Sequence, residues 1–407
     1  MHDSAGRPRP RLLFDSTMRT GAILVVLMAL AVTAGASQAA PFVPTDDAVV
    51  LERLPSRNDP AIAELRRQQL ALAREARDPR RASLVAQRAL QAARASGDPR
   101  FIGQAQAALM PWWNAVDAPA YVVTLRATIK QSLHDFPAAL VDLDRLIERG
   151  DGDAQALLTR ATILTVIGRY ESAKRDCTSL ASRVDALVAA TCMAGVASVT
   201  GDADSAYRLL EDAMTNAAGP AEVRVWAHTL AAEIASRRGD AAGAERHFVR
   251  ALASGTSDAY LKAAYADFLL DQRRFASVVS LLRNETRNDA LLLRLALAEK
   301  HLAGHADAFA RHREDLAARF EAARRRSDTL HLREEARFAL EIEGDARRAL
   351  ALARQNWEKQ REPADLRILA AAAAAANDPS ARTAVSEWIA KTGYRDVALA
   401  STTRNAD

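Results

Sequence analysis

Apolar side chains recur at helical spacing along almost the whole chain after residue 60. Segments of about 12 to 20 residues carry apolar positions three to four residues apart, and strand-forming residues are nowhere clustered. Short polar turns separate these segments and offer left-handed C-caps and side-chain N-caps. Clear examples are Ser96-Gly97-Asp98, Gly150-Asp151-Gly152, Gly201-Asp202 and Gly239-Asp240. The pattern predicts an all-α protein.

The turns between paired helices recur at a nearly fixed interval. Their centres are His134, Gly168, Gly201, Gly239, Arg273, Gly304 and Gly344. The successive spacings are 34, 33, 38, 34, 31 and 40 residues, with a mean of 35. A period of this length with two helices per unit is typical of a helical solenoid.

The side chains around the turns repeat as well. Seven residues before the turn centre, five units have a small residue: Ala127, Ala161, Ala194, Ala232 and Ala266. Small residues at this point allow two helices to cross closely. In the last two units Leu297 and Arg337 stand where the small residue is expected, which leaves the register there open by one helical turn.

These units resemble tetratricopeptide repeats, most clearly in residues 154–180 with Gly168-Arg169-Tyr170-Glu171-Ser172-Ala173. The resemblance covers about residues 120–360 and implies a right-handed superhelical solenoid of antiparallel helix pairs. The expected organisation is 1–39 signal peptide, 40–59 extended leader, 60–117 degenerate N-terminal helical repeats, 118–362 tetratricopeptide-like repeats, and 363–407 C-terminal capping hairpin and tail.

The N-terminus has the features of a secretory signal. A basic stretch ending at Arg19 precedes an apolar run over residues 21–32 and then the small residues Ser37-Gln38-Ala39. This order predicts cleavage after Ala39 and a periplasmic or secreted product without a stable membrane span. A retained membrane anchor is the alternative, although the run is short for a span. Met18 is a second candidate start beside Met1.

Two cysteines, Cys177 and Cys192, stand 15 residues apart on either side of a predicted turn. On antiparallel helices they would lie level with each other, and an oxidising compartment would permit a disulfide. Such a bridge would stabilise the fold by roughly 3 kcal/mol. Two buried free thiols are the equally weighted alternative.

The family resemblance implies a concave groove lined by the first helix of each unit, which would hold a peptide. The positions about 13, 10, 6 and 3 residues before each turn centre supply the candidates Tyr121, Thr124, Thr128, Gln155, Thr162, Thr191, Trp226, Thr229, Glu233, Tyr260, Asp267 and Arg294. The early groove is neutral and rich in hydroxyl groups. Its middle offers aromatic rings beside carboxylates, which suits an extended peptide with basic or apolar side chains. Alternatively, each is an ordinary solvent-facing helix residue.

Composition and charge exclude several classes of function. Hydrophobic residues make up 49% of the chain but aromatic residues only 5%, and Gly (17) and Pro (14) are sparse. The net charge is +4, of which the first 39 residues contribute +2, and no basic stripe indicates a nucleic-acid partner. Motifs of hydrolases, phosphate loops and dinucleotide sites are missing from the sequence, so neither catalysis nor a cofactor is expected.

One histidine group offers a weak metal-binding alternative. His301 and His305 stand four residues apart and His312 follows, but Gly304 is expected to interrupt the helix and leave turn histidines. The preferred function is a non-catalytic scaffold of the cell envelope that binds a protein or peptide through its groove and assists assembly of an envelope or exported complex. The rivals are a structural subunit of a larger envelope machine, which would use its convex face and termini, and a metal-binding accessory protein.

Overall fold

The computed structural model describes residues 46, 59–216 and 219–399. The predicted signal peptide with its cleavage site, the candidate start at Met18 and nearly all of the leader lie outside the described residues. The chain divides into residues 1–56, of which only Asp46 is described, and the compact unit 57–407. All that follows concerns this second unit.

Its described residues form helices joined by turns, without a strand. The elements are α2 (Pro60–Arg74), α3 (Pro79–Ser96), α4 (Arg100–Ala108), η1 (Met110–Trp112), α5 (Ala120–Ser132), α6 (Phe136–Glu148), α7 (Ala154–Val166), α8 (Tyr170–Leu180), α9 (Ala186–Ala197), α10 (Ala203–Asn216), α11 (Ala221–Arg238), α12 (Ala241–Leu252), α13 (Ala259–Asp271), α14 (Phe275–Leu282), α15 (Asp289–Glu299), α16 (Ala306–Arg325), α17 (Leu332–Phe338), η2 (Ala339–Glu343), α18 (Ala346–Lys359), α19 (Pro363–Ala375) and α20 (Pro379–Thr392). The all-α prediction is confirmed. None of the described helices combines the length and apolarity needed to cross a bilayer.

Nine antiparallel hairpins, from α3/α4 to α19/α20, follow one another along the described chain. All seven predicted turn centres have a positive φ, including the non-glycine residues His134 (56°) and Arg273 (55°). Gly97 and Asn377 end the outermost first helices in the same way. An aspartate follows several of these centres and caps the second helix; Asp240 Oδ1, for example, accepts the Gly243 N–H at 2.8 Å.

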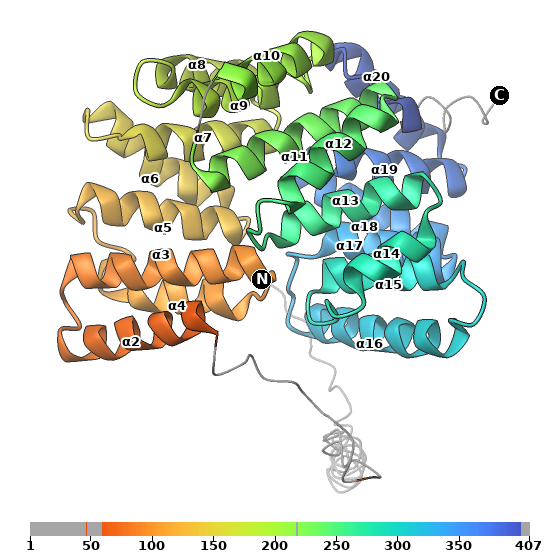
Figure 1. The fold of residues 1–407 in the computed structure, drawn as a ribbon, viewed down its shortest axis with the longest axis horizontal. Helices are drawn as coiled ribbons and strands as arrows, with labels where there is room; N and C mark the ends of the chain where they lie inside the picture. Colours follow the sequence, from red (N-terminus) through yellow and green to blue (C-terminus); the bar gives the residue numbers. More distant parts are fainter. Residues whose placement is uncertain (1–45, 47–58, 217–218, 400–407) are drawn as a thin grey trace, which may run out of the picture. The chain divides into compact units, whose positions relative to one another are not determined.

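The first helix of each hairpin lies on the inner, concave side. Each first helix contacts the first helix of the next unit, from α3·α5 through α17·α19, whereas the described second helices make no comparable contacts with one another. Spacing that is closer on one side curves the stack toward that side. Figure 1 shows the resulting path, which rises from α2 to α8 and descends from α11 to α16.

The apolar core is divided along the stack. Four separate clusters of buried side chains follow one another along it and belong mainly to neighbouring hairpins. The five alanines at the predicted crossing position are 0–1% exposed, which places them between closely packed helices. This is the arrangement of a tetratricopeptide-like solenoid, as predicted, and differs from a globule around one centre.

The unit containing Arg337 shows why its pattern departs from the others. Residues Ala339–Glu343 form a π-helical turn between α17 and Gly344, and such a turn inserts one extra residue. The small residue at the crossing is therefore Ala336, which is fully buried, one position earlier than expected. The shift is one residue rather than a helical turn, and it leaves Arg337 on the inner side.

Cys177 on α8 and Cys192 on α9 form a disulfide with a Cα–Cα distance of 5.5 Å. Both side chains are buried in the cluster built around α5 to α9. The bridge joins the second helix of one unit to the first helix of the next, so it fixes an inter-unit junction.

Units far apart in the sequence also touch. A first seam links α3 to the segments preceding α13 and α15 through three polar contacts: Arg94 Nε to Asp258 Oδ2 (2.8 Å), Ser257 Oγ to the Ala95 carbonyl (3.0 Å), and Asn288 Nδ2 to the Gly97 carbonyl (3.1 Å). The stack thus curves until its coils meet. The sequence analysis expected a continuous open groove and did not foresee this closure, because contacts between coils leave no periodic signal.

A second seam places the C-terminal units against the turn between α7 and α8. The Arg361 N–H donates to the Val166 carbonyl at 2.7 Å. The Trp388 ring lies 6.1 Å from that of Tyr170 and 5.2 Å from that of Trp357, and the Arg361 guanidinium lies over it at 5.1 Å. Unlike the first seam, this contact is largely aromatic. Both seams together enclose part of the inner surface.

Candidate binding site on the inner surface

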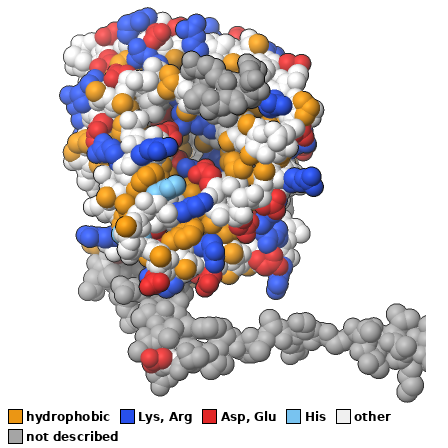
Figure 2. Space-filling view, turned by 90° about the vertical axis from the view of Figure 1, so that its right-hand side faces the viewer, with side chains coloured by type: hydrophobic (Ala, Val, Ile, Leu, Met, Phe, Trp, Pro, Cys, Tyr) orange, Lys and Arg blue, Asp and Glu red, His pale blue; other side chains and the backbone are white. Residues whose placement is uncertain are grey.

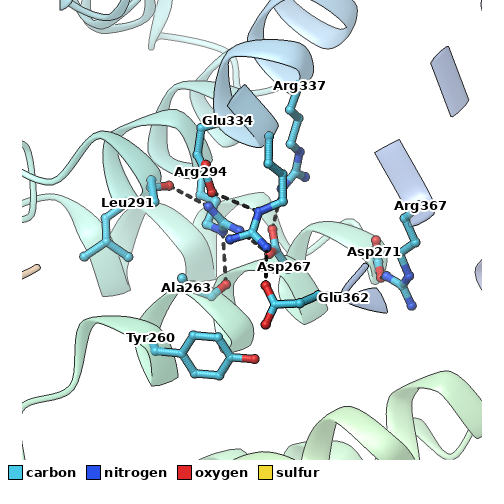
Figure 3. A network of polar contacts seen from close by, with 12 residues as sticks. Tyr260, Ala263, Asp267, Asp271, Leu291, Arg294, Glu334, Arg337, Glu362 and Arg367 are labelled. Carbon is cyan, nitrogen blue, oxygen red and sulfur yellow. Dashed lines mark hydrogen bonds and ion pairs between the residues drawn. The ribbon is translucent and has the colours of Figure 1, made fainter. Parts of the chain in front are cut away.

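A set of charged side chains gathers where the first helices α13, α15, α17 and α19 face inward. We call it the inner charged cluster; its members are Asp267, Asp271, Arg294, Arg333, Glu334, Arg337, Glu341, Glu362, Asp365 and Arg367. The tight curvature brings together side chains from helices that are distant in sequence. Figure 3 shows Asp267 beside Arg294 and Arg337, with Arg367 beside Asp271.

Three arginines of the cluster occupy one repeated position. Arg294 and Arg367 each stand ten residues before their left-handed turn residue, Gly304 and Asn377. Arg333 stands eleven before Gly344, which becomes ten once the extra residue of the π-helical turn is allowed for. Equivalent positions on successive first helices lie side by side, so the repeat builds a row of guanidinium groups.

Asp267 is held by two of the arginines. Its Oδ2 lies 2.5 Å from Arg294 Nη2 and its Oδ1 lies 2.5 Å from Arg337 Nη1. Burial alone would raise the pKa of Asp267, but the two guanidinium groups outweigh burial and bring it to about 2. Arg294 also donates to the Ala263 and Ala290 carbonyls, so all three of its nitrogens are engaged.

Arg333 is surrounded by carboxylates, at 3.2 Å from Glu334, 2.9 Å from Glu362 and 3.4 Å from Asp365. Burial raises the pKa of Glu334, but Arg333 reverses this and lowers it to about 2. For Asp365 burial prevails over the attraction of Arg333 and raises the pKa to about 7. The Asp365 side chain is fully buried and accepts a hydrogen bond from Asn356 Nδ2 at 2.7 Å.

Arg367 links α19 to α13 and to the end of the described chain. Its Nη1 lies 2.8 Å from Asp271 Oδ2, and its Nε lies 2.7 Å from Asp396 Oδ2. The Tyr394 hydroxyl donates to the same Asp396 oxygen at 3.1 Å. Burial raises the pKa of Asp271 despite the attraction of Arg367, so the negative charge of Asp271 is incompletely compensated.

Tyr260 and Glu233 extend the site toward α11. The Tyr260 hydroxyl donates to Glu233 Oε1 at 2.7 Å, and the Tyr260 side chain is 56% exposed. Desolvation by the surrounding protein nevertheless raises the pKa of Tyr260 well above its usual value, and burial likewise raises that of Glu233. A ring that is accessible and yet surrounded by protein lies on the wall of a hollow interior.

A cavity of about 220 Å³ opens beside the cluster. One wall is charged and includes Asp267, Asp271, Arg337 and Glu341. The other is aliphatic and comes from α19 and the segment after α20: Ala364, Ile368, Ala371, Ala398 and Leu399. Such a pocket can hold a side chain with an apolar stem and a polar end. We refer to it as the inner pocket.

Four of the predicted groove residues, Glu233, Tyr260, Asp267 and Arg294, meet on this inner surface through the contacts above. Trp226 does not join them, because it is half-buried and packs against the core cluster of α5 to α9. The expectation of an aromatic floor made of Trp226 and Tyr260 is therefore wrong in its first member. The sequence could not separate an inward ring from a ring in the joint between units.

The predicted hydroxyl-rich early groove also needs correction. Thr124, Thr191 and Thr229 are buried. Five of the predicted threonines donate their hydroxyl hydrogens to the carbonyl four residues earlier in their own helix: Thr124, Thr128, Thr162, Thr191 and Thr229. These hydroxyl donors are already used and are not offered to a ligand. Gln155 donates to Thr159 at 3.2 Å, and Tyr121 is 40% exposed.

The three histidines considered as metal ligands make separate contacts. The His301 ring stacks on Phe275 at 4.6 Å, His305 precedes α16 as its N-cap residue, and His312 Nδ1 lies 2.7 Å from Glu299 Oε2. As expected, α15 ends at Glu299, before Gly304, so the histidines do not share one helix. Within the described part of the chain, no group of three or more His, Cys, Asp or Glu side chains is arranged for a metal ion.

The surface carries both signs of charge. Figure 2 shows Lys and Arg side chains interspersed with Asp and Glu over the face it views, with apolar side chains between them. In the inner charged cluster, six carboxylates accompany four guanidinium groups. Neither place offers a continuous basic track.

No protein-family model and no curated protein matches this sequence. Among solved structures, a tetratricopeptide repeat protein from Parabacteroides merdae is 12% identical, with 77% of this chain and 98% of that chain covered and a TM-score of 0.36. The human IFIT1 dimer with m7Gppp-AAAA is 13% identical, with 86% of each chain covered and a TM-score of 0.42. A monomeric IFIT1 mutant with the same RNA is 14% identical, with 81% of each covered and a TM-score of 0.42.

Proposed function

We propose that this protein is a non-catalytic scaffold that binds a protein or peptide on the inner surface of its solenoid. The observation that carries the proposal is the exposed Tyr260 ring beside the inner pocket. A large aromatic side chain left accessible on a concave surface is typical of a recognition site. The repeat fold supports the proposal, because stacked helix pairs provide an extended surface for a partner.

The state of the charged groups supports binding rather than catalysis. Arg294, Arg333, Arg337 and Arg367 are all engaged in ion pairs. Asp365 has a pKa near neutrality, which would suit proton transfer, but its side chain is fully buried and away from any substrate. These groups order the inner surface instead of presenting a reactive atom.

A polypeptide partner fits the charges better than a nucleic acid does. A phosphate backbone would meet six carboxylates in the inner charged cluster, and the four guanidinium groups there already have carboxylate partners. A peptide can offer charges of both signs together with apolar side chains, and it matches the mixed lining of the inner pocket.

We further propose that the chain is exported and acts in the cell envelope or outside the cell, where it assists assembly of an envelope or exported complex. The N-terminal signal pattern and the disulfide between Cys177 and Cys192 support this location. Determination of the N-terminal residue of the protein purified from its native cells tests it. Export with cleavage predicts a chain that begins at Ala40, whereas an uncleaved N-terminus would contradict it.

Photo-crosslinking from two positions tests the binding surface. A photoreactive phenylalanine analogue replaces Tyr260 on the inner side or, as the matched control, Val249 on the second helix α12, which is 50% exposed. We expect a crosslinked partner from position 260 and none from position 249. Crosslinks from 249 alone would instead favour the rival in which the protein is a structural subunit that uses its convex face, where Val141 is also 49% exposed.

A further inference from the structure

The proposed function leaves open which chemical group of a partner the inner pocket accepts. Its volume of about 220 Å³ is smaller than the about 300 to 1,000 Å³ usual for complete small-molecule sites. It is nevertheless several times the roughly 30 Å³ that one water occupies in the liquid. A single long side chain of a bound partner fits this size better than a whole cofactor does.

The positive groups of the pocket are already committed. Every side-chain nitrogen of Arg294 and of Arg367 donates to a carboxylate or a carbonyl. Arg337 donates through Nε to Glu341 Oε1 at 2.8 Å and through Nη1 to Asp267. An anionic ligand would have to break these pairs, and that would leave buried carboxylates unpaired at a large free-energy penalty.

The negative groups, in contrast, have oxygens to spare. Asp271 is bonded only through Oδ2 and the Glu341 carboxylate only through Oε1, so that within the described residues Asp271 Oδ1 and Glu341 Oε2 have no hydrogen-bond partner. The two side chains are 41% and 40% exposed and both line the inner pocket. The raised pKa of Asp271 also indicates a shortage of positive charge around it.

The opposite wall supplies a surface for an aliphatic stem. Ile368 and Ala371 on α19 and Leu399 at the end of the described chain line the pocket. A lysine or arginine side chain combines an apolar stem with a cationic end that donates several hydrogen bonds. A neutral apolar side chain would leave the two carboxylate oxygens without donors.

We propose that the inner pocket anchors a lysine or arginine side chain of the bound polypeptide, with its cationic end on Asp271 and Glu341 and its stem against Ile368 and Leu399. This inference rests on the proposed function and specifies it. It makes the pocket the point that selects among partners, while Tyr260 contributes to the surface around it.

Selection from a random peptide library against the full chain tests the inference. We expect the selected peptides to be enriched in lysine or arginine. Their binding to Asp271→Asn and Glu341→Gln should be at least about tenfold weaker, since each substitution removes a charge partner and keeps the size of the side chain. Replacing the basic residue by citrulline or norleucine should weaken binding to the unaltered protein to the same extent.

The control is Glu245→Gln, which alters the surface ion pair with Arg274 outside the pocket and should leave binding unchanged. Circular dichroism verifies that each variant is folded. Selected peptides without basic residues, or with undiminished affinity for both pocket variants, would overturn the inference. If such peptides still lose affinity with Tyr260→Ala, the proposed function stands without it, and if no peptide is selected at all, both fail.

Discussion

Asp267 on α13 and Arg337 on α17 form an ion pair of 2.5 Å, although they are 70 residues apart and α15 lies between their helices in the sequence. The pair therefore spans two steps of the repeat. Only a strongly curved inner face brings alternate first helices so close. The same curvature brings Arg367 on α19 to Asp271 on α13.

Removal of the Arg337 guanidinium should weaken the fold. Arg337→Ala leaves Asp267 paired with Arg294 alone, and we expect the free energy of unfolding to fall by about 1 to 2 kcal/mol, because both groups are only partly exposed. Urea denaturation measures the change. In the double variant with Asp267→Asn the loss should be less than the sum of the two single losses. Strict additivity would show that the pair is not coupled.

Reduction of the disulfide should destabilise the protein. Opening the bridge between Cys177 and Cys192 frees a loop of 15 residues, which lowers the free energy of unfolding by roughly 3 kcal/mol. Denaturation with and without dithiothreitol measures this loss. The variant Cys177→Ser, Cys192→Ser serves as the control, since its midpoint should not respond to the reductant. Equal midpoints for the unaltered protein under both conditions would contradict the prediction.

A pair of histidines outside the binding site should make stability depend on pH. His228 Nδ1 and His247 Nδ1 lie 3.0 Å apart, and His247 Nε2 also lies 3.1 Å from the Tyr207 hydroxyl and 3.0 Å from Glu211. Burial lowers the pKa of each histidine to about 4, and the neighbouring charges include Arg250. Both rings are therefore neutral in the folded protein at physiological pH.

The sign of the effect follows from these values. The unfolded chain takes up protons below pH about 6.5, whereas the folded histidines resist protonation until about pH 4. The contribution of this pair to stability should thus be complete above pH 6.5 and fall by about 1 to 3 kcal/mol as the pH approaches 4. Urea denaturation across this range measures it. His247→Gln should flatten the slope, and an unchanged slope in that variant would refute the assignment.

Asp365 should act in the opposite direction. Because its pKa is raised to about 7, the folded protein retains a proton that the unfolded chain loses above about pH 4. Its contribution therefore decreases as the pH rises from 4 to 7. Asp365→Asn, which imitates the protonated form, should remove this decrease in the same urea series. Loss of stability at both ends of the range would argue that Asp365 is charged when folded.

The two seams should differ in strength. Arg94→Ala removes an ion pair whose arginine is 57% exposed, and we expect a loss of at most about 1 kcal/mol. Trp388→Ala removes a ring that packs against Tyr170 and Trp357, and the expected loss is about 3 kcal/mol. Thermal and urea denaturation of both variants give the comparison. A larger effect of Arg94→Ala would reverse the order proposed for the seams.

The sequence was sufficient to identify the repeat, since helix pairs and turns depend on local chemistry. His134 and Arg273 were identified as turn centres by spacing although neither is glycine, and both have a positive φ. Glu233, Tyr260, Asp267 and Arg294 followed from their distance to the turn. The same distance applied to the last hairpin would have found Arg367.

Other features depend on packing that a single unit does not encode. Arg333 and Arg337 escaped because the π-helical turn shifts their unit by one residue, and the departure of Arg337 from the alanine pattern was the available signal. Trp226 was misplaced because a half-buried joint and an inner wall have the same helical spacing. The seams involve residues such as Arg94 and Asp258, 164 positions apart, whose proximity follows only from the accumulated curvature.

The central claim is that stacked helix pairs curve until distant units meet and enclose an inner surface. A distance measurement between spin labels at positions 96 and 257, on the two sides of the first seam, tests it most directly. The disulfide leaves no free cysteine among the described residues to compete for the labels. The account predicts a narrow distribution at short distance, and a broad distribution at long distance, as an open solenoid would give, would contradict it.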